Sequence, residues 1–137
     1  MIVQPYLFFE GRCEEAATFY QSALGAEVTM LMRYKDSPDA QTPDMLPPGS
    51  ESKVMHMSLR IGDTTIMASD GLCKMTPVFQ GFSLSLTADN IAGAETMFAA
   101  LADGGQVQQP LMTTFFSPRF GMVTDRFGVS WMVLVAG

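Results

Sequence analysis

The hydrophobic pattern predicts two helices, each followed by a glycine. Over residues 12–24 an apolar stripe that includes aromatic residues recurs every three or four positions, which is typical of an amphipathic helix, and Gly25 ends it. A second stripe runs from Ile91 to Ala102, with Asn90 before it as a helix cap and Gly104-Gly105 after it. The same helical unit therefore occurs twice in the chain.

Strands are predicted on both sides of each helix, one before it and three after it. A repeat of this length indicates one small unit used twice, because a single unit cannot bury its apolar face alone. We therefore predict an α+β fold of tandem βαβββ units, with two mixed four-stranded sheets around a cleft and the helices outside. A single domain is expected over residues 1–137, with unit one at about 1–72 and unit two at about 78–137. The predicted strands are Ile2–Phe9, Ala26–Tyr34, Val54–Ile61, Thr64–Ser69, Gly81–Thr87, Gln106–Thr113, Gly121–Asp125 and Val129–Val135.

One predicted hairpin separates a mixed face from an apolar face. If Gly62-Asp63 forms its turn, strand alternation fixes which side chains share each face. The apolar face is expected under a helix, and the mixed face is suited to line a ligand site. The mixed face would carry His56, Ser58, Arg60, Thr65, Met67 and Ser69, and the apolar face Met57, Leu59, Ile61, Ile66 and Ala68.

A proline-rich stretch, Asp36–Ser52, predicts a long loop that serves as a lid, as a partner contact or as a plain insertion. Composition then limits the partners. The net charge of −6 disfavours nucleic acid and anionic membrane surfaces, and no apolar run approaches the roughly 20 residues that span a bilayer. Without a signal-like N-terminus, and with two cysteines that lack metal or redox spacing, we expect a cytoplasmic protein with reduced thiols.

Few side chains suggest chemistry. His56 is the only histidine, and on the mixed face it would act as a general base or as a ligand anchor. The alternative is a half-buried histidine that is hydrogen-bonded to its strand neighbours. Arg119 lies in the aromatic segment Thr113–Phe120, which suits either the edge of a pocket or a dimer contact. The 12 methionines suit an adaptable apolar pocket or simple filling of the core.

Four segments of the chain carry a family resemblance: Pro5–Phe9, Ala16–Tyr20, His56–Ile61 and Gly121–Met132. Together with the order of the elements, they resemble the vicinal oxygen chelate superfamily of glyoxalases, bleomycin-resistance proteins and extradiol dioxygenases. In detail they are similar to its PhnB-like branch, which is often labelled 3-demethylubiquinone-9 3-methyltransferase-like. The resemblance implies the tandem βαβββ fold and a homodimer, while function is implied less strongly because one fold supports many activities.

Enzymes of this superfamily hold a divalent metal with four side chains, usually His or Gln and then Glu, two from each unit. Carried over, these positions fall near Gln4 or Pro5, at Met67, at Phe82 or Ser83, and at Met132. A neutral thioether cannot replace a carboxylate as a ligand of a hard or borderline dication. The usual metal set is therefore expected to be missing, and no cofactor is predicted.

These observations favour a small-molecule-binding protein of the glyoxalase/bleomycin-resistance fold that lacks the usual metal ligands. The alternative is a divalent-metal-dependent lyase or dioxygenase with ligands relocated to His56, Asp70 or Glu51. The methyltransferase label is disfavoured, because the sequence has no glycine-rich strand-to-helix turn with an acidic residue downstream. The candidate ligand-binding residues are His56, Ser58, Met67, Ser69, Ser83, Met132 and Arg119.

Overall fold

The computed structural model describes residues 1–37, 46–73 and 76–137. It divides the chain into two compact units, Met1–Pro77 and Val78–Gly137, which are described separately below. That both units belong to one domain stays a prediction.

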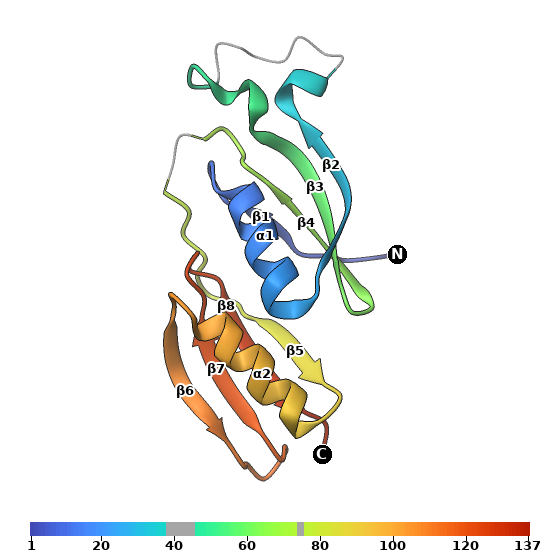
Figure 1. Cartoon of the computed structure of the whole chain (residues 1–137), viewed down its shortest axis with the longest axis vertical. Coiled ribbons are helices and arrows are strands. Elements are labelled where there is room, and N and C mark those ends of the chain that lie inside the picture. Colours follow the sequence, from blue (N-terminus) through green and yellow to red (C-terminus); the bar gives the residue numbers. More distant parts are fainter. Residues whose placement is uncertain (38–45, 74–75) are drawn as a thin grey trace. The chain divides into compact units, whose positions relative to one another are not determined.

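Unit one is a four-stranded sheet with one helix lying across it (Figure 1). The strands lie in the order β1-β4-β3-β2, in which β1 runs parallel to β4 and the other pairs are antiparallel. Two short 3-10 helices, η1 (Tyr34–Asp36) and η2 (Ser50–Ser52), lie between β2 and β3. The elements are β1 (Tyr6–Phe8), α1 (Cys13–Leu24), β2 (Glu27–Arg33), β3 (Val54–Ile61) and β4 (Thr64–Ser69).

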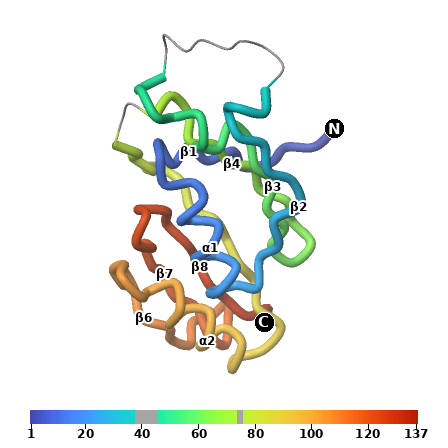
Figure 2. Tube along the Cα trace, turned by 45° about the horizontal axis from the view of Figure 1, so that its top comes forward, coloured from blue at the N-terminus to red at the C-terminus, as the bar shows by residue number. Residues whose placement is uncertain are grey.

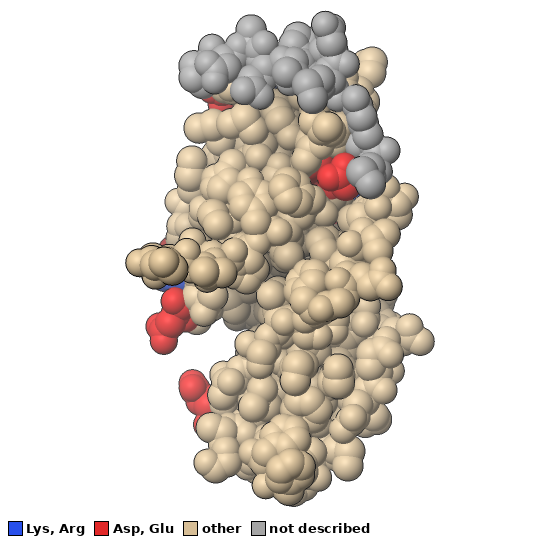
Figure 3. Space-filling model, turned by 180° about the vertical axis from the view of Figure 1, so that it is seen from behind, with Lys and Arg blue, Asp and Glu red and all other residues tan. Residues whose placement is uncertain are grey.

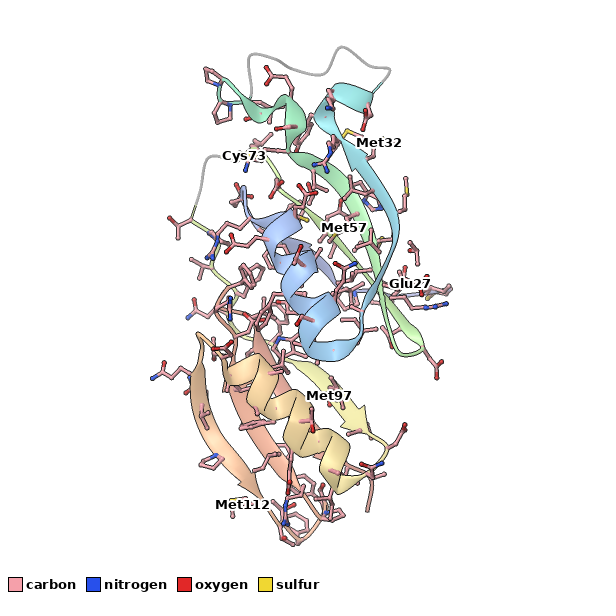
Figure 4. All side chains as sticks on the ribbon, viewed as in Figure 1. Glu27, Met32, Met57, Cys73, Met97 and Met112 are labelled. Atoms are coloured by element: carbon pink, nitrogen blue, oxygen red, sulfur yellow. The ribbon has the colours of Figure 1, made fainter. Side chains whose placement is uncertain are left out.

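The core of unit one lies between α1 and the sheet. Glu14 and Glu15 occupy the first turn of α1, where they complement the helix dipole, and Gly25 ends the helix in the left-handed conformation at φ 67°. Met57 projects from β3 on the side that faces α1 (Figure 4) and is 1% exposed. The other buried apolar side chains of this layer include Leu7, Phe9, Cys13, Ala16, Tyr20, Leu59, Ile66 and Ala68.

The predicted β3–β4 hairpin is confirmed in its bounds and in its register. Arg60 pairs with Thr65 and Ser58 pairs with Met67. The apolar face of the hairpin is buried under α1, except for Ile61, which is half-buried. The mixed face is therefore directed away from the helix.

Unit two repeats the same plan (Figure 2). Its strands lie in the order β5-β8-β7-β6, with β5 parallel to β8, and α2 packs on one face of the sheet. Trp131 on β8 is buried at 3% exposure, as its alternation with Met132 predicts. The two mixed four-stranded sheets confirm the predicted fold class. The elements are β5 (Leu84–Ala88), α2 (Ile91–Ala102), β6 (Gln106–Met112), β7 (Phe120–Thr124) and β8 (Ser130–Val135).

Two predicted strands were too long at their N-terminal ends. Regular pairing of β1 begins only at Tyr6, after Pro5, and Ile2 and Val3 are 80% and 91% exposed. The strand predicted from Gly81 begins at residue 84, because Gly81 has a positive φ of 82° that no regular strand accommodates. Apolar character marked both segments as strands, although neither start has a pairing partner in the sheet.

The stretch predicted as one long irregular loop, Asp36–Ser52, contains the end of η1 and all of η2. Residues 38–45 of this stretch lie outside the described part of the structure. Among the described residues, no helix has the length and apolar character that crossing a bilayer requires.

Candidate functional site

The candidate site is the face of the unit-one sheet that lies away from α1, here called the open face. The strand register places Tyr6 of β1 beside Met67 of β4, Met67 beside Ser58 of β3, and His56 beside Met32 of β2. Figure 3 shows the side of the molecule opposite to that in Figure 1, and unit one there is almost entirely uncharged, with acidic residues toward its margins. The open face consists of Tyr6, Phe8, Met30, Met32, His56, Ser58, Met67 and Ser69.

A short chain of hydrogen bonds crosses the open face. The Tyr6 hydroxyl lies 2.9 Å from Nδ1 of His56, and the Ser58 hydroxyl lies 3.4 Å from Nε2 of the same ring. Ser58 follows His56 by two residues on β3, and Tyr6 reaches the ring from β1, across β4, so the imidazole lies between a partner on its own strand and one from the edge of the sheet. Both ring nitrogens of His56 are thereby engaged, one tightly and one loosely.

Burial raises the pKa of Tyr6 above its ordinary value, although a hydrogen bond from Ser69 opposes the shift. Tyr6 is therefore a neutral phenol at neutral pH and can donate its proton to His56. Ser69 is itself buried, and its Oγ accepts the backbone N–H of Gly71 at 2.9 Å. Tyr34, whose pKa burial also raises, approaches the same serine and donates to the Gly71 carbonyl.

Aromatic and sulfur-containing side chains surround this polar chain. The Phe8 ring is 50% exposed and lies 5.0 Å from the Tyr6 ring, centroid to centroid, and the His56 ring lies 5.6 Å from the Tyr6 ring. Met30 is 45% exposed, and Met32 projects from β2 (Figure 4). Such exposed aromatic area on one sheet face is typical of a binding surface.

The arginines of unit one are paired. Arg60 forms an ion pair with Glu27 at the hairpin end of the sheet. Arg33 donates two hydrogen bonds to the Glu14 carboxylate, at 3.1 and 2.7 Å, and one to the Ser52 carbonyl. Arg12 is paired with Glu15 on the same helix. None of these guanidinium groups is held free for an anionic ligand.

The structure brings four predicted site residues together in unit one: His56, Ser58, Met67 and Ser69. Tyr6 and Phe8 were not predicted, because their position beside His56 depends on the parallel pairing of β1 with β4. The one available signal was the alternation of Tyr6 and Phe8 in the first strand, which puts both rings on one face.

The remaining three predicted residues lie in unit two. The Ser83 hydroxyl bonds that of Ser130 at 2.7 Å, on the same sheet face as Met132. Arg119 lies on the other side, where it contacts Glu95 of α2 at 3.6 Å and donates to Thr113 Oγ1 at 3.0 Å. Unit two therefore groups Ser83 with Met132 and does not bring Arg119 to them.

The positions expected to hold a metal do not offer a ligand set. Met67 is paired in register with Tyr6, and Met132 with Ser85. Thioethers, a neutral phenol and a serine hydroxyl do not suit a hard or borderline dication. In the ranges 1–37, 46–73 and 76–137, no three His, Cys, Asp or Glu side chains are grouped as metal ligands.

Asp70 was considered as a relocated metal ligand, but its carboxylate already accepts hydrogen bonds from the protein backbone. It is 1% exposed, and its carboxylate accepts the backbone N–H groups of Gly11, Cys13 and Val54 at 2.7–2.9 Å. A carboxylate held by three backbone donors is a structural group.

The two sheets and their helices have the fold of the glyoxalase/bleomycin-resistance class of proteins. The glyoxylase/bleomycin resistance protein/dioxygenase domain from Frankia sp. EAN1pec shares this fold, with a TM-score of 0.67 over 98% of this chain and 94% of that chain, at 12% identity. Within the class, the chain belongs to the family described as 3-demethylubiquinone-9 3-methyltransferase, whose model matches residues 2–134.

More similar proteins cover nearly the whole chain. Protein YjdN of Escherichia coli (strain K12) is 32% identical, over 98% of this chain and 95% of its own length. The crystal structure of protein PA1353 from Pseudomonas aeruginosa is 40% identical with a TM-score of 0.84, covering 99% of this chain and 98% of that one. A putative 3-demethylubiquinone-9 3-methyltransferase, PhnB protein, from Bacillus cereus is 30% identical with a TM-score of 0.81, covering 99% and 100%.

Proposed function

We propose that this protein binds a small, partly apolar molecule on the open face of unit one. The observation that carries the proposal is the Tyr6–His56–Ser58 hydrogen-bond chain, which lies among exposed aromatic and methionine side chains. A few placed polar groups in apolar surroundings are the usual composition of a small-molecule site. The apolar area supplies affinity, and the polar chain fixes the orientation of the ligand.

The competing interpretation is that His56 only satisfies its strand neighbours. A purely structural histidine would leave unexplained why Tyr6 and Phe8 are 37% and 50% exposed beside it. Large exposed rings on one sheet face have an unfavourable contact with water, which a bound molecule would relieve. Ser83 and Met132 remain predicted ligand contacts on their own face of the unit-two sheet. Arg119 would have to give up its contacts with Glu95 and Thr113 to bind a ligand.

The proposal is tested by screening a chemically diverse fragment library against the full chain, with amide chemical shifts as the readout. We expect binders that shift the amides of β1, β3 and β4, and whose effect is lost in Tyr6→Ala together with His56→Ala. The control is Val107→Thr, which changes an apolar residue of β6 that is 44% exposed. A screen without binders at the open face, or binders insensitive to the double variant, would reject the proposal.

No specific observation favours either alternative activity, the metal-dependent lyase or dioxygenase or the methyltransferase. Of the three residues considered as relocated metal ligands, His56, Asp70 and Glu51, Asp70 already has its carboxylate held by three backbone donors. The methyltransferase in the family description would need a site for a methyl donor, and the glycine-rich turn that binds adenosyl cofactors in doubly wound folds is missing from the sequence.

We further propose that the protein is a cytoplasmic homodimer. Cys13 and Cys73 are free thiols, as is typical of a reducing compartment. The support for a dimer is an exposed aromatic pair, Phe115 and Phe116, at 101% and 47% exposure. A second copy of the chain would cover such a pair.

A further inference from the structure

We propose that the ligand of the open face is a flat, uncharged aromatic ring that carries an acceptor oxygen such as a ketone carbonyl. This inference rests on the proposed function and specifies its ligand class. Three properties of the face lead to it: the geometry of its rings, the direction of its hydrogen bonds and the pairing of its charges.

The first property is a shelf of three rings, defined as Tyr6, Phe8 and His56. The Tyr6 ring lies at the centre, with Phe8 at 5.0 Å and an interplanar angle of 31°, and His56 at 5.6 Å and 44°. Aromatic rings at these separations prefer offset or tilted contacts, and a further flat ring can make contacts of the same kind with the exposed parts of the shelf. Met67 lies next to Tyr6 in the sheet, and thioether sulfur also contacts aromatic rings favourably. A flat ring gains more from this shelf than a saturated ring of the same size.

The second property is the direction of the hydrogen bonds. Because Tyr6 keeps its proton and a phenol is a better donor than acceptor, its hydroxyl donates to Nδ1 of His56 at 2.9 Å. An imidazole that accepts a hydrogen bond at Nδ1 carries its hydrogen on Nε2. Within the described part of the chain, the partner of that N–H is the Ser58 hydroxyl, at a long 3.4 Å. The polar chain therefore presents two donors to a ligand, the loosely bound Nε2–H and the Ser58 hydroxyl, and these favour a ligand that offers an acceptor.

The third property is charge. Arg60 is paired with Glu27, and Arg33 is paired with Glu14. The Lys53 ammonium donates a hydrogen bond to the Gly11 carbonyl at 2.9 Å. An anionic ligand would have to displace one of these partners, and the chain as a whole carries a net charge of −6. Moving a carboxylate or phosphate from water to an apolar face without a cation is unfavourable. The acceptor oxygen of the ligand is therefore expected to be uncharged.

Four matched probes separate these properties: acetophenone, ethylbenzene, cyclohexyl methyl ketone and benzoate. Ethylbenzene lacks the acceptor, cyclohexyl methyl ketone lacks the flat ring, and benzoate adds a charge. Each is titrated into the full chain while amide chemical shifts are followed. We expect acetophenone to bind at β1, β3 and β4, with each of the other probes about 2- to 10-fold weaker, the value of one modest interaction.

Variants then assign each preference to its residue. His56→Phe keeps a ring but removes the donor, so the preference for acetophenone over ethylbenzene should vanish while the preference over cyclohexyl methyl ketone remains. His56→Gln restores a donor and should regain part of the first preference. Phe8→Ala should reduce the preference for the flat ring, and Val107→Thr should change neither ratio.

Equal affinities for all four probes, tighter binding of benzoate, or probe-induced shifts confined to other surfaces would overturn the ligand class. The proposed function would still stand if a different library compound bound the open face and required Tyr6 and His56. If nothing binds that face, both proposals fail.

Discussion

The carboxylate of Asp70 joins three segments of unit one that are distant in sequence. Oδ1 accepts the N–H groups of Gly11 and Cys13 at the start of α1, and Oδ2 accepts that of Val54 at the start of β3. Charge-assisted hydrogen bonds of this kind are about twice as strong as neutral ones. One buried side chain therefore fixes the helix against the sheet that carries the candidate site.

Replacing Asp70 by Asn should destabilise the protein by about 2–4 kcal/mol, because the amide NH2 would face the Val54 N–H and leave a buried donor unsatisfied. Urea denaturation measures the loss. Asp89→Asn, at an exposed position before α2, should change stability by less than about 0.5 kcal/mol. Equal effects of the two substitutions would contradict the structural role given to Asp70.

The thiol of Cys13 gives a pH dependence of stability. Burial raises its pKa far above the ordinary value of 9.0, and the nearby charges of Asp70 and Glu14 raise it further. In the unfolded chain the thiol ionises near 9.0, while in the folded protein it stays protonated. Stability from this group is therefore complete below about pH 9 and falls as the pH rises, by about 1.4 kcal/mol per unit.

This slope is measured by urea denaturation at several pH values between about 7 and 10.5. Cys13→Ala lowers stability at every pH by leaving a cavity, but it should flatten the alkaline slope. Cys73→Ala is the matched control, because Cys73 is half-buried and burial raises its pKa less. Parallel curves for wild type and Cys13→Ala would show that the thiol does not titrate on unfolding.

At the scale of elements, the two helices differ in how their N-termini are capped. Asn90 caps α2 locally, accepting the Gly93 N–H at 2.7 Å, and this cap was predicted from the sequence. Arg12, at the same position before α1, makes no side-chain cap, and Asp70 supplies the acceptor instead. A local cap can be recognised from neighbouring residues, whereas a cap from another strand requires the folded sheet.

Asn90→Ala should therefore cost about 1 kcal/mol, because the Gly93 N–H loses its acceptor. Asn90→Asp keeps an acceptor oxygen at the helix N-terminus and should be close to neutral or slightly stabilising. Thermal unfolding of both variants separates the cap from a general effect of the substitution. If both variants unfold like the wild type, α2 does not depend on this cap.

The β3–β4 hairpin shows how far sequence reasoning reaches. Its turn at Gly62-Asp63 set the register, so the grouping of His56, Ser58 and Met67 on one face followed from alternation alone. The contribution of β1 did not follow, since parallel pairing between strands about 60 residues apart has no local turn that fixes it. The hydrogen bond from Tyr6 to His56 was missed for this reason. The same limit applies to the early starts predicted for β1 and β5.

At the scale of the whole molecule, the repeated strand–helix–three-strand order was enough to predict both sheets. Each unit buries its apolar helix face against its own sheet. The local sequence pattern does not determine which exposed surfaces of the chain bind a ligand or a second copy of the protein. Unit two carries an exposed apolar surface of this kind around Phe115 and Phe116.

The local structure around Phe115 and Phe116 keeps both rings exposed. Phe115 and Phe116 meet edge to face at 5.2 Å, and Phe116 in turn packs on the buried Phe120 at 5.1 Å. Ser117 holds the turn that carries them: its N–H donates to Thr114 Oγ1 and its hydroxyl donates to the Val135 carbonyl, so the turn does not depend on burial of the rings in the core. The proline-rich stretch Asp36–Ser52 is a further candidate for a partner contact, and within it Leu46 is half-buried while Met45 lies outside the described residues.

We predict that the protein is a dimer at micromolar concentration, with a mass by light scattering of about twice the 14.9 kDa of one chain. Phe115→Ser with Phe116→Ser should shift the mass toward the monomer, because a stable interface of roughly 1,500 Å² depends on a few buried aromatic anchors. Val107→Thr, which changes an exposed apolar residue of β6, should leave the dimer intact. A monomer mass for the wild type would refute dimerisation. A dimer that survives the double substitution would place the interface on another surface, and the open face of unit one would then be the next to test with Phe8→Ser.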